Sequence, residues 1–291
     1  MFPRAFVALL AVAAAAVGAS SASASERIDL NATGVRLAVN DRGQALLTYR
    51  AGGRQRRVLV WGAVNARHPH PRIPQVRFRK HYSTPVRSFR NTCAPYDGPA
   101  LNWFRLGCKA ADGSYWAVQS WQRMLPGRGA SPTPRQAAWE LRLSHWQGAL
   151  PQLQIKLDWA YRRYDHLYGT YTYLGHPIFG FRVTRNGAPR DGYGRNLYLD
   201  TFNSAHGRGW RREAGFLAQN PRGNFCYGFF RRGNRPIGKG ERYRVTIIGP
   251  GVTPDVYWES GAPGPYDREA DRVANEEQRA LSAGSKYCHP N

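Results

Sequence analysis

Carboxylate side chains are few in this chain, and they are the first residues to consider for catalysis. Hydrolysis of a glycosidic bond needs two carboxyl groups at a fixed separation, one as acid and one as base or nucleophile. Polar and apolar residues alternate along 139–144 and 153–159, so Glu140 and Asp158 are predicted on polar faces of neighbouring strands that could share a cleft. Because arginine is abundant, we expect salt bridges rather than catalysis from the candidate carboxylates, which are Glu140, Asp158, Asp165, Asp200 and Glu213.

Other catalytic signatures are missing from the sequence. It contains no G-x-S-x-G turn, HExxH helix, phosphate-binding loop or dinucleotide fingerprint. His68 and His70 flank a proline and could bind a metal, but without a carboxylate nearby in sequence an exposed turn is favoured. We therefore expect no metal and no cofactor. A polysaccharide-active hydrolase or lyase that uses Glu140, Asp158 and Glu213 is kept as the alternative.

Two segments combine aromatic rings with arginine, as a binding surface does. In 159–173, stacked rings and guanidinium groups suit a sugar face or an unpaired base, although alternate tyrosines could simply fill a core. In 191–213, glycine-rich loops surround polar groups that could hold hydroxyls or, with Asp200 and Asn203, Ca²⁺; turn formation is the alternative. The predicted ligand-binding residues are Tyr161, Arg162, Tyr164, His166, Tyr193, Arg195, Asp200, Asn203, His206 and Trp210.

Positive charge dominates the sequence and is unevenly distributed. The 291 residues include 42 Lys and Arg against 19 Asp and Glu, a formal net charge of +23. The stretch 42–96 holds twelve Lys or Arg and no carboxylate, whereas five of the 19 acids lie within 267–277. Such a field attracts polyanions. We expect an anionic polysaccharide or cell-envelope polymer as partner, with nucleic acid less favoured.

The first 24 residues predict export from the cytoplasm. Arg4, an apolar run over 5–18 and small residues up to Ala24 are typical of a signal peptide that is cleaved near Ala24. The apolar run is shorter than the ~20 residues of a spanning helix, and no later segment resembles one, so we expect a secreted or cell-surface protein. Four cysteines suit an oxidising compartment, and the predicted disulfides are Cys93 with Cys108 and Cys226 with Cys288.

The pattern of short alternating segments predicts an all-β fold, an antiparallel sandwich or jelly roll, with one C-terminal α-helix. A meander is indicated over 35–82, and the segments 139–144 and 153–159 suggest one long hairpin. The helix is expected at about 267–282, packed over the basic sheet and held there by Cys288. We predict a single domain over 25–291.

These observations favour a secreted, basic protein that binds an extracellular polysaccharide or other polyanion without catalysis. The enzyme described above is one alternative, and a structural component of the cell envelope is another. Charge and aromatic content support the first hypothesis.

Overall fold

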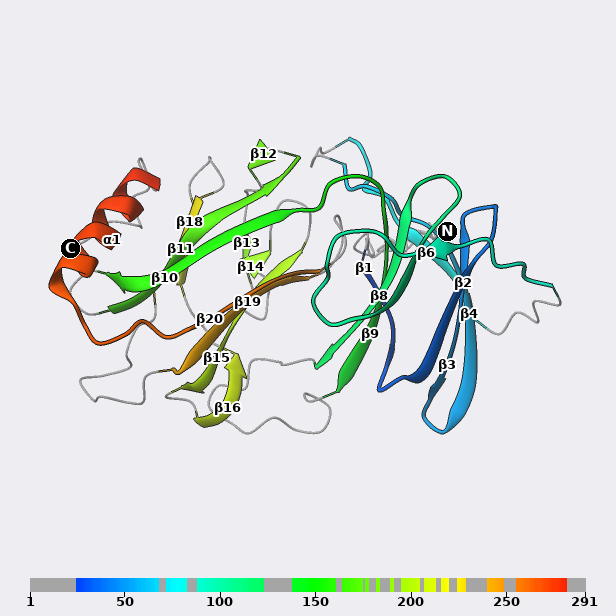
Figure 1. Cartoon of the computed structure of the whole chain (residues 1–291), viewed down its shortest axis with the longest axis horizontal. Coiled ribbons are helices and arrows are strands. Elements are labelled where there is room, and N and C mark those ends of the chain that lie inside the picture. Colours follow the sequence, from blue (N-terminus) through cyan, green and yellow to red (C-terminus); the bar gives the residue numbers. More distant parts are fainter. Residues whose placement is uncertain are drawn as a thin grey trace, which may run out of the picture.

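The computed structural model describes residues 25–67, 72–82, 88–122, 138–160, 164–174, 176–177, 182–183, 189–190, 195–204, 207–212, 216–219, 224–228, 240–248 and 255–281. Their strands form four antiparallel sheets, arranged in two halves along the long axis of the molecule (Figure 1). The all-β fold with a C-terminal helix is therefore confirmed. The predicted leader, 1–24, lies outside the described residues. Within these ranges, no helix is both long and apolar enough to span a membrane.

Four consecutive strands form a meander at one end of the molecule, as predicted from their alternation. They pair in sequence order, and the strands are β2 (Thr33–Val39), β3 (Gln44–Ala51), β4 (Arg54–Gly62) and β5 (Phe78–Tyr82). The first turn is closed by the Asn40 side-chain oxygen, which accepts hydrogen bonds from the backbone N–H groups of Arg42 (3.1 Å) and Gln44 (2.9 Å). Gly43 there has a φ of +66°, which a residue without Cβ adopts at little cost.

A second sheet packs against the meander and completes the first sandwich. Its order is β1-β9-β8-β7-β6, with β1 (Ser25–Leu30), β6 (Ala94–Pro95), β7 (Phe104–Lys109), β8 (Tyr115–Gln122) and β9 (Trp139–Trp146). Leu47 and Val58 of the meander share one buried core with Trp116 and Leu143 of this sheet. Burying these large apolar side chains is the main force that holds the two sheets together.

One of the two predicted disulfides falls within the described residues. Cys93 and Cys108 lie at disulfide distance, with their Cα atoms 5.6 Å apart, beside the β6–β7 pair. Cys226 belongs to β18, and Cys288 lies outside the described residues, so their pairing stays a prediction.

The second half is another pair of facing sheets. One has the order β10-β11-β18-β17 with β12 on β11, and its strands are β10 (Gln152–Ala160), β11 (Tyr164–Tyr173), β12 (His176–Pro177), β17 (Phe216–Gln219) and β18 (Asn224–Gly228). The other has the order β13-β14-β15-β19-β20 with β16 on β15, and its strands are β13 (Arg182–Val183), β14 (Pro189–Arg190), β15 (Asn196–Ser204), β16 (Gly207–Arg212), β19 (Arg242–Ile248) and β20 (Val256–Gly261). Leu167 and Tyr171 meet Leu199, Val245 and Ile247 in a second core.

The predicted long hairpin over 139–159 is wrong. β9 pairs with β1 and β8 in the first half, whereas β10 pairs with β11 in the second, so the chain crosses between the halves at 147–151. Alternation identified both strands correctly, but it carries no information about which strand is the partner. Glu140 and Asp158 consequently belong to different sheets.

The C-terminal helix forms where the sequence predicts it, as α1 (Arg268–Leu281). Asp267 caps its start, because its side-chain oxygen accepts a hydrogen bond from the Ala270 backbone N–H at 2.7 Å. The helix packs against β10, at the opposite end of the molecule from β2 to β4 (Figure 1). The expectation that it covers the basic sheet is therefore wrong.

Candidate functional site

The outer face of the meander is the strongest candidate surface, and strand register defines it. Antiparallel partners point to the same side of a sheet, so each cross-strand row of residues shares one face. Three such rows lie opposite the core. They are Arg36–Thr48–Arg57, Ala38–Leu46–Leu59–His81 and Gln44–Trp61–Arg79, with Arg50 beyond the first row. We call this set the outer face.

Four arginines give the outer face its charge. Arg36, Arg50, Arg57 and Arg79 are all exposed, and none of them forms an ion pair with another residue in the described part of the chain. The strands β2 to β5 contain no carboxylate, and the nearest one in sequence is Asp41 in the β2–β3 turn. Four like charges therefore stand on one sheet without neutralising partners.

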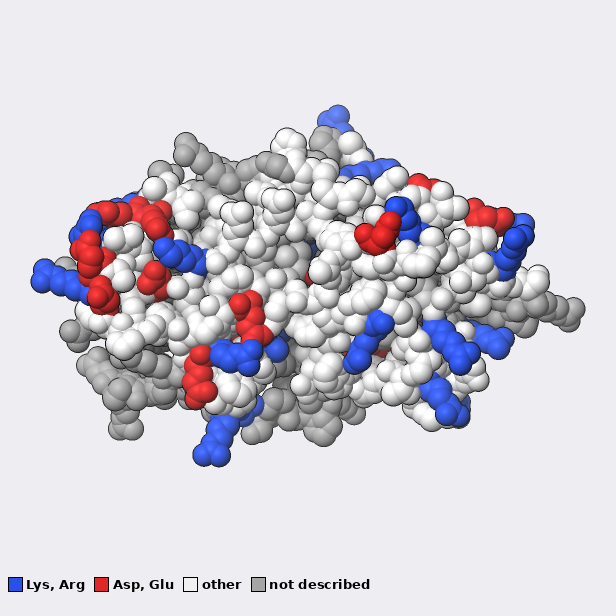
Figure 2. Space-filling view, in the orientation of Figure 1, with Lys and Arg blue, Asp and Glu red and all other residues white. Residues whose placement is uncertain are grey.

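Two cations on the other side of the same strands are paired. Arg56 lies 3.6 Å from Asp29, and Lys80 forms an ion pair with Glu26, both acids coming from β1. The alternating direction of side chains thus places these two paired cations on the inner side of the sheet and the four arginines of the outer face on the other side. Figure 2 shows Lys and Arg side chains over β2 to β4 at one end of the molecule, with Asp and Glu gathered around α1 at the other.

The middle of the outer face is apolar. Ala38, Leu46, Leu59 and Trp61 are each partly buried, and they form a strip between the arginines of the flanking rows. Trp61 lies between Gln44 and Arg79 in its row. An aromatic ring flanked by an amide and a guanidinium group can stack on a ligand and bond its polar edge.

Glu140 and Asp158, two of the carboxylates of the hydrolase or lyase hypothesis, belong to different sheets and are bonded to other protein groups. Glu140 is 3% exposed, and its Oε2 accepts a hydrogen bond from Arg142 Nε at 2.9 Å. Arg142 also lies 3.8 Å from Asp255, so its guanidinium holds two carboxylates. Asp158, in another sheet, accepts a bond from the Trp159 backbone N–H at 2.8 Å and lies 3.8 Å from Lys156. Glu213 lies outside the described residues.

A serine, a histidine and an aspartate that the sequence motifs did not reveal lie together in the first half. Ser114 Oγ lies 2.9 Å from His145 Nε2 and donates a hydrogen bond to Asp112 Oδ1 at 2.5 Å. In a nucleophilic triad the imidazole stands between hydroxyl and carboxylate, whereas here the hydroxyl stands in the middle. Ser114 is 2% exposed and His145 4%, so the hydroxyl does not face solvent. The group is a structural network.

Described members of the segment 159–173 pack inside the second half. Tyr171 and Tyr173 contribute to its core, Trp159 Nε1 donates to the Gly264 carbonyl at 2.7 Å, and Tyr168 Oη donates to Glu277 at 2.5 Å. The side chains of Tyr168, Tyr171 and Tyr173 are thus buried, which agrees with the alternative for these three residues. Of the predicted ligand residues here, Tyr161 and Arg162 lie outside the described residues; Tyr164 and His166 belong to β11, but their side chains are not described.

In the segment 191–213, the described polar groups bond one another. Asp200, 1% exposed, accepts bonds from Arg212 Nε (2.7 Å) and Arg244 Nε (2.9 Å). Asn203 has a φ of +52° and its side-chain oxygen accepts from the Gly209 N–H at 2.8 Å, which is turn chemistry. These oxygens are therefore occupied by protein donors rather than arranged for Ca²⁺. No cluster of three potential metal ligands occurs among the residues that the structure describes.

Arg195 and Trp210, two further predicted ligand residues of this segment, contact aromatic rings or arginines of the protein itself. Arg195 is 1% exposed, and its guanidinium carbon lies 4.9 Å from the ring centre of Tyr171, so the two predicted segments do meet, but inside the protein. The ring centres of Trp210 and Phe202 are 5.3 Å apart, and the guanidinium carbon of Arg244 lies 4.3 Å from the ring centre of Trp210. Tyr193 and His206 lie outside the described residues. Ligand binding by this set stays a prediction.

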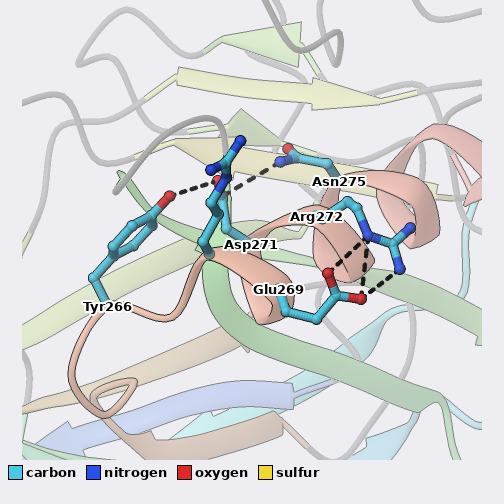
Figure 3. A pocket seen from close by; sticks show the side chains of 6 residues that line it. Tyr266, Glu269, Asp271, Arg272 and Asn275 are labelled. Carbon is cyan, nitrogen blue, oxygen red and sulfur yellow. Dashed lines mark hydrogen bonds and ion pairs between the residues drawn. The ribbon is translucent and has the colours of Figure 1, made fainter.

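A cleft of about 600 Å³ lies beside the first turns of α1. Figure 3 shows Tyr266, Glu269, Asp271, Arg272 and Asn275 around it, with their polar groups directed at one another. Arg272 binds Glu269 and Glu276, while Asp271 accepts from Tyr266 and from Asn275, each at 3.3 Å. The charges of Glu269, Asp271 and Arg272 are bonded within the cleft, and Arg268 is the one lining cation with no ion pair among the described residues, whereas the outer face has four.

Comparison of the chain with protein-family models, with curated proteins and with solved structures found no match.

Proposed function

We propose that the mature chain is a non-catalytic protein outside the cell that binds an anionic polymer on the outer face of the β2–β5 sheet. One observation carries the proposal: Arg36, Arg50, Arg57 and Arg79 are exposed on one face, without ion-pair partners in the described chain. Bringing four unpaired like charges together raises the electrostatic energy of the free protein. A polyanion relieves that repulsion and releases its own counterions when it binds.

Two features support an extracellular setting. The leader over 1–24 has the composition of a cleaved signal, and Cys93 and Cys108 lie at disulfide distance, which suits an oxidising compartment. Polymers bearing carboxylate, sulfate or phosphate groups are the anions that a basic protein encounters outside a cell. The position of α1 at the far end of the molecule leaves the outer face uncovered by acidic residues of the helix.

The test compares salt-dependent binding of the wild type with that of a fourfold variant, Arg36, Arg50, Arg57 and Arg79→Ser. We expect the variant to elute from a heparin column at clearly lower NaCl. The slope of log K against log[NaCl] should become shallower by about 3, since roughly 0.7 counterions are released per contact on a flexible polyanion.

The matched control removes the same charge elsewhere. Arg105, Arg208, Arg268 and Arg279 are exposed and lie off the outer face, so their fourfold serine variant should elute close to the wild type. Equal losses in both variants would show that only net charge matters and would contradict a defined site. Incubation of the wild type with polyanions should release no shortened product, and release that is lost in Glu140→Gln would favour the enzyme instead.

A further inference from the structure

We propose that the polymer bound by the outer face is an anionic polysaccharide, with one sugar ring stacked on Trp61 and its acidic substituent beside Arg79. This inference rests on the proposed function and specifies its ligand. The observation behind it is the row Gln44–Trp61–Arg79, in which register places an aromatic ring between an amide and an unpaired cation on three neighbouring strands. Trp61 is partly exposed, so a face or edge of its ring is open to a ligand.

The amide of Gln44 is oriented for this role. Asn40 Nδ2 donates a hydrogen bond to Gln44 Oε1 at 2.9 Å, which directs the acceptor atom of the amide into the turn. The Nε2 donor of Gln44 is thereby left for another partner. A pyranose ring offers an apolar face for the indole, hydroxyls for an amide donor and, when acidic, a carboxylate or sulfate for a guanidinium group.

The number of exposed rings favours a polysaccharide over a nucleic acid. Arg36 and Arg57 are two strand spacings apart, about 10 Å, and Arg50 lies diagonal to both at about 7 to 8 Å, a spacing that does not by itself distinguish the two polymers. A nucleic-acid strand is bound by a cationic groove with several aromatic rings on which successive bases stack. The outer face offers a single indole, which suits a polymer in which one sugar ring is stacked at a time.

The apolar strip also argues against a lipid surface. Side chains that enter a bilayer must project beyond the charged groups around them. Leu46 and Leu59 are partly buried and short, whereas the flanking Arg36, Arg57 and Arg79 are longer and exposed. The strip is recessed between cations, so it can contact a flat ring laid on the sheet but cannot be inserted into acyl chains.

Trp61→Ala tests the ring separately from the charge. Three probes are compared by titration calorimetry at one salt concentration. Polygalacturonate has acidic sugar rings, long-chain polyphosphate has charge without rings, and oligothymidylate represents a nucleic acid. We expect Trp61→Ala to weaken polygalacturonate binding about ten-fold, which is the order of affinity lost with one stacking contact. Binding of polyphosphate should weaken less than about two-fold, because it has no ring to stack. Trp61→Phe should retain most of the polygalacturonate affinity.

Two controls separate binding from folding. Trp139→Ala removes an indole that is 45% exposed at the start of β9, and it should change neither affinity. The thermal unfolding midpoint of each variant shows whether the fold is retained, and Trp61→Phe carries the test if Trp61→Ala unfolds. Equal weakening toward both polymers, or tighter binding of oligothymidylate than of polygalacturonate by the wild type, would overturn the sugar assignment. Failure of the wild type to bind any of the three would overturn the proposed function itself.

Discussion

His145 shows how a buried network depends on one proton. The Gly62 carbonyl, 2.9 Å away, can only accept, so Nδ1 of His145 carries a hydrogen. The Ser114 hydroxyl has a single proton and two neighbours that can accept it, Nε2 of His145 and Asp112. This proton is donated to Asp112, so the hydroxyl oxygen faces Nε2 of His145. Trp116, stacked 3.9 Å from the His145 ring, encloses the site.

Burial lowers the pKa of His145, although the Gly62 carbonyl and the charge of Asp112 oppose the shift. The unfolded chain therefore binds more protons than the folded one near pH 6, and stability is lost as the pH falls from about 6.5, the ordinary histidine value, through the lower folded pKa. We predict that the urea midpoint of the wild type decreases between pH 7 and 5 and that His145→Gln reduces this slope.

The control for that measurement is His81→Gln, which replaces an exposed histidine on the outer face and should keep the wild-type slope. An identical slope in His145→Gln and wild type would show that His145 does not contribute to the pH dependence.

Single residues also show the limit of sequence motifs. The Asp112–Ser114–His145 network joins a tight turn to a strand 31 residues away, and no motif spans that separation. Exposure was equally hard to predict for Asp200, which looks like a ligand residue in a glycine-rich segment but is enclosed by Arg212 and Arg244. The arginines of the outer face were not among the predicted ligand residues, although alternation along β2 to β4 indicates which side chains oppose the core and could have identified them.

At the scale of elements, local patterns predicted strands and the helix but not their partners. The meander was predicted because its strands follow one another with short turns and keep one face toward solvent. β9 was misassigned to a hairpin because alternation marks a strand without identifying its partner. The outer face of β9, including Glu140, Ser144 and Trp146, is buried as well. A strand that is covered on both sides gives no alternation in burial from which its neighbours can be inferred.

The docking of α1 depends on Glu277. Its carboxylate accepts hydrogen bonds from Lys156 Nζ on β10 (2.6 Å) and from Tyr168 Oη on β11 (2.5 Å), and these two donors lower the pKa of Glu277. A depressed folded pKa means that the stabilisation is present above the ordinary glutamate range and is lost as the pH falls through the folded value. Solvent screens the Lys156 pair, since both side chains are partly exposed.

We predict that Glu277→Gln lowers the protection of α1 amides against hydrogen exchange at pH 7 by about 1 kcal/mol, the order of one hydrogen bond to a charged group in a partly exposed site. Glu276→Gln is the matched control, because Glu276 pairs only with the exposed Arg272 in the contacts described and should change protection little. The difference between wild type and Glu277→Gln in helix content should vanish once the pH falls below the lowered folded pKa of Glu277, where the carboxylate is protonated. Equal exchange in both variants would contradict a special role for Glu277.

At the scale of the whole molecule, buried polar contacts join the two halves. Gln119 of β8 accepts a hydrogen bond from the Asp255 backbone N–H at 3.1 Å, and the side chain of Asp255 lies 3.8 Å from Arg142. Trp103 meets Tyr257 of β20 edge to face at 4.3 Å. Gln119 is fully buried on the outer face of its sheet, so parting the halves would break its bond to Asp255 and expose both groups to water.

These contacts predict that residues 25–291 unfold as one domain, despite their two cores. Near-ultraviolet circular dichroism, which reports aromatic packing, and far-ultraviolet circular dichroism, which reports the sheets, should give coincident denaturant transitions with the disulfides intact. Asp255→Ala removes one carboxylate from Arg142 and should lower the free energy of unfolding by about 3 kcal/mol, the lower end for breaking a buried ion pair. Asp158→Ala, which removes a partly exposed carboxylate of β10, is the control and should cost less than about 1 kcal/mol. Two separated transitions in the wild type would show instead that each sandwich is stable alone and that the halves are independent domains.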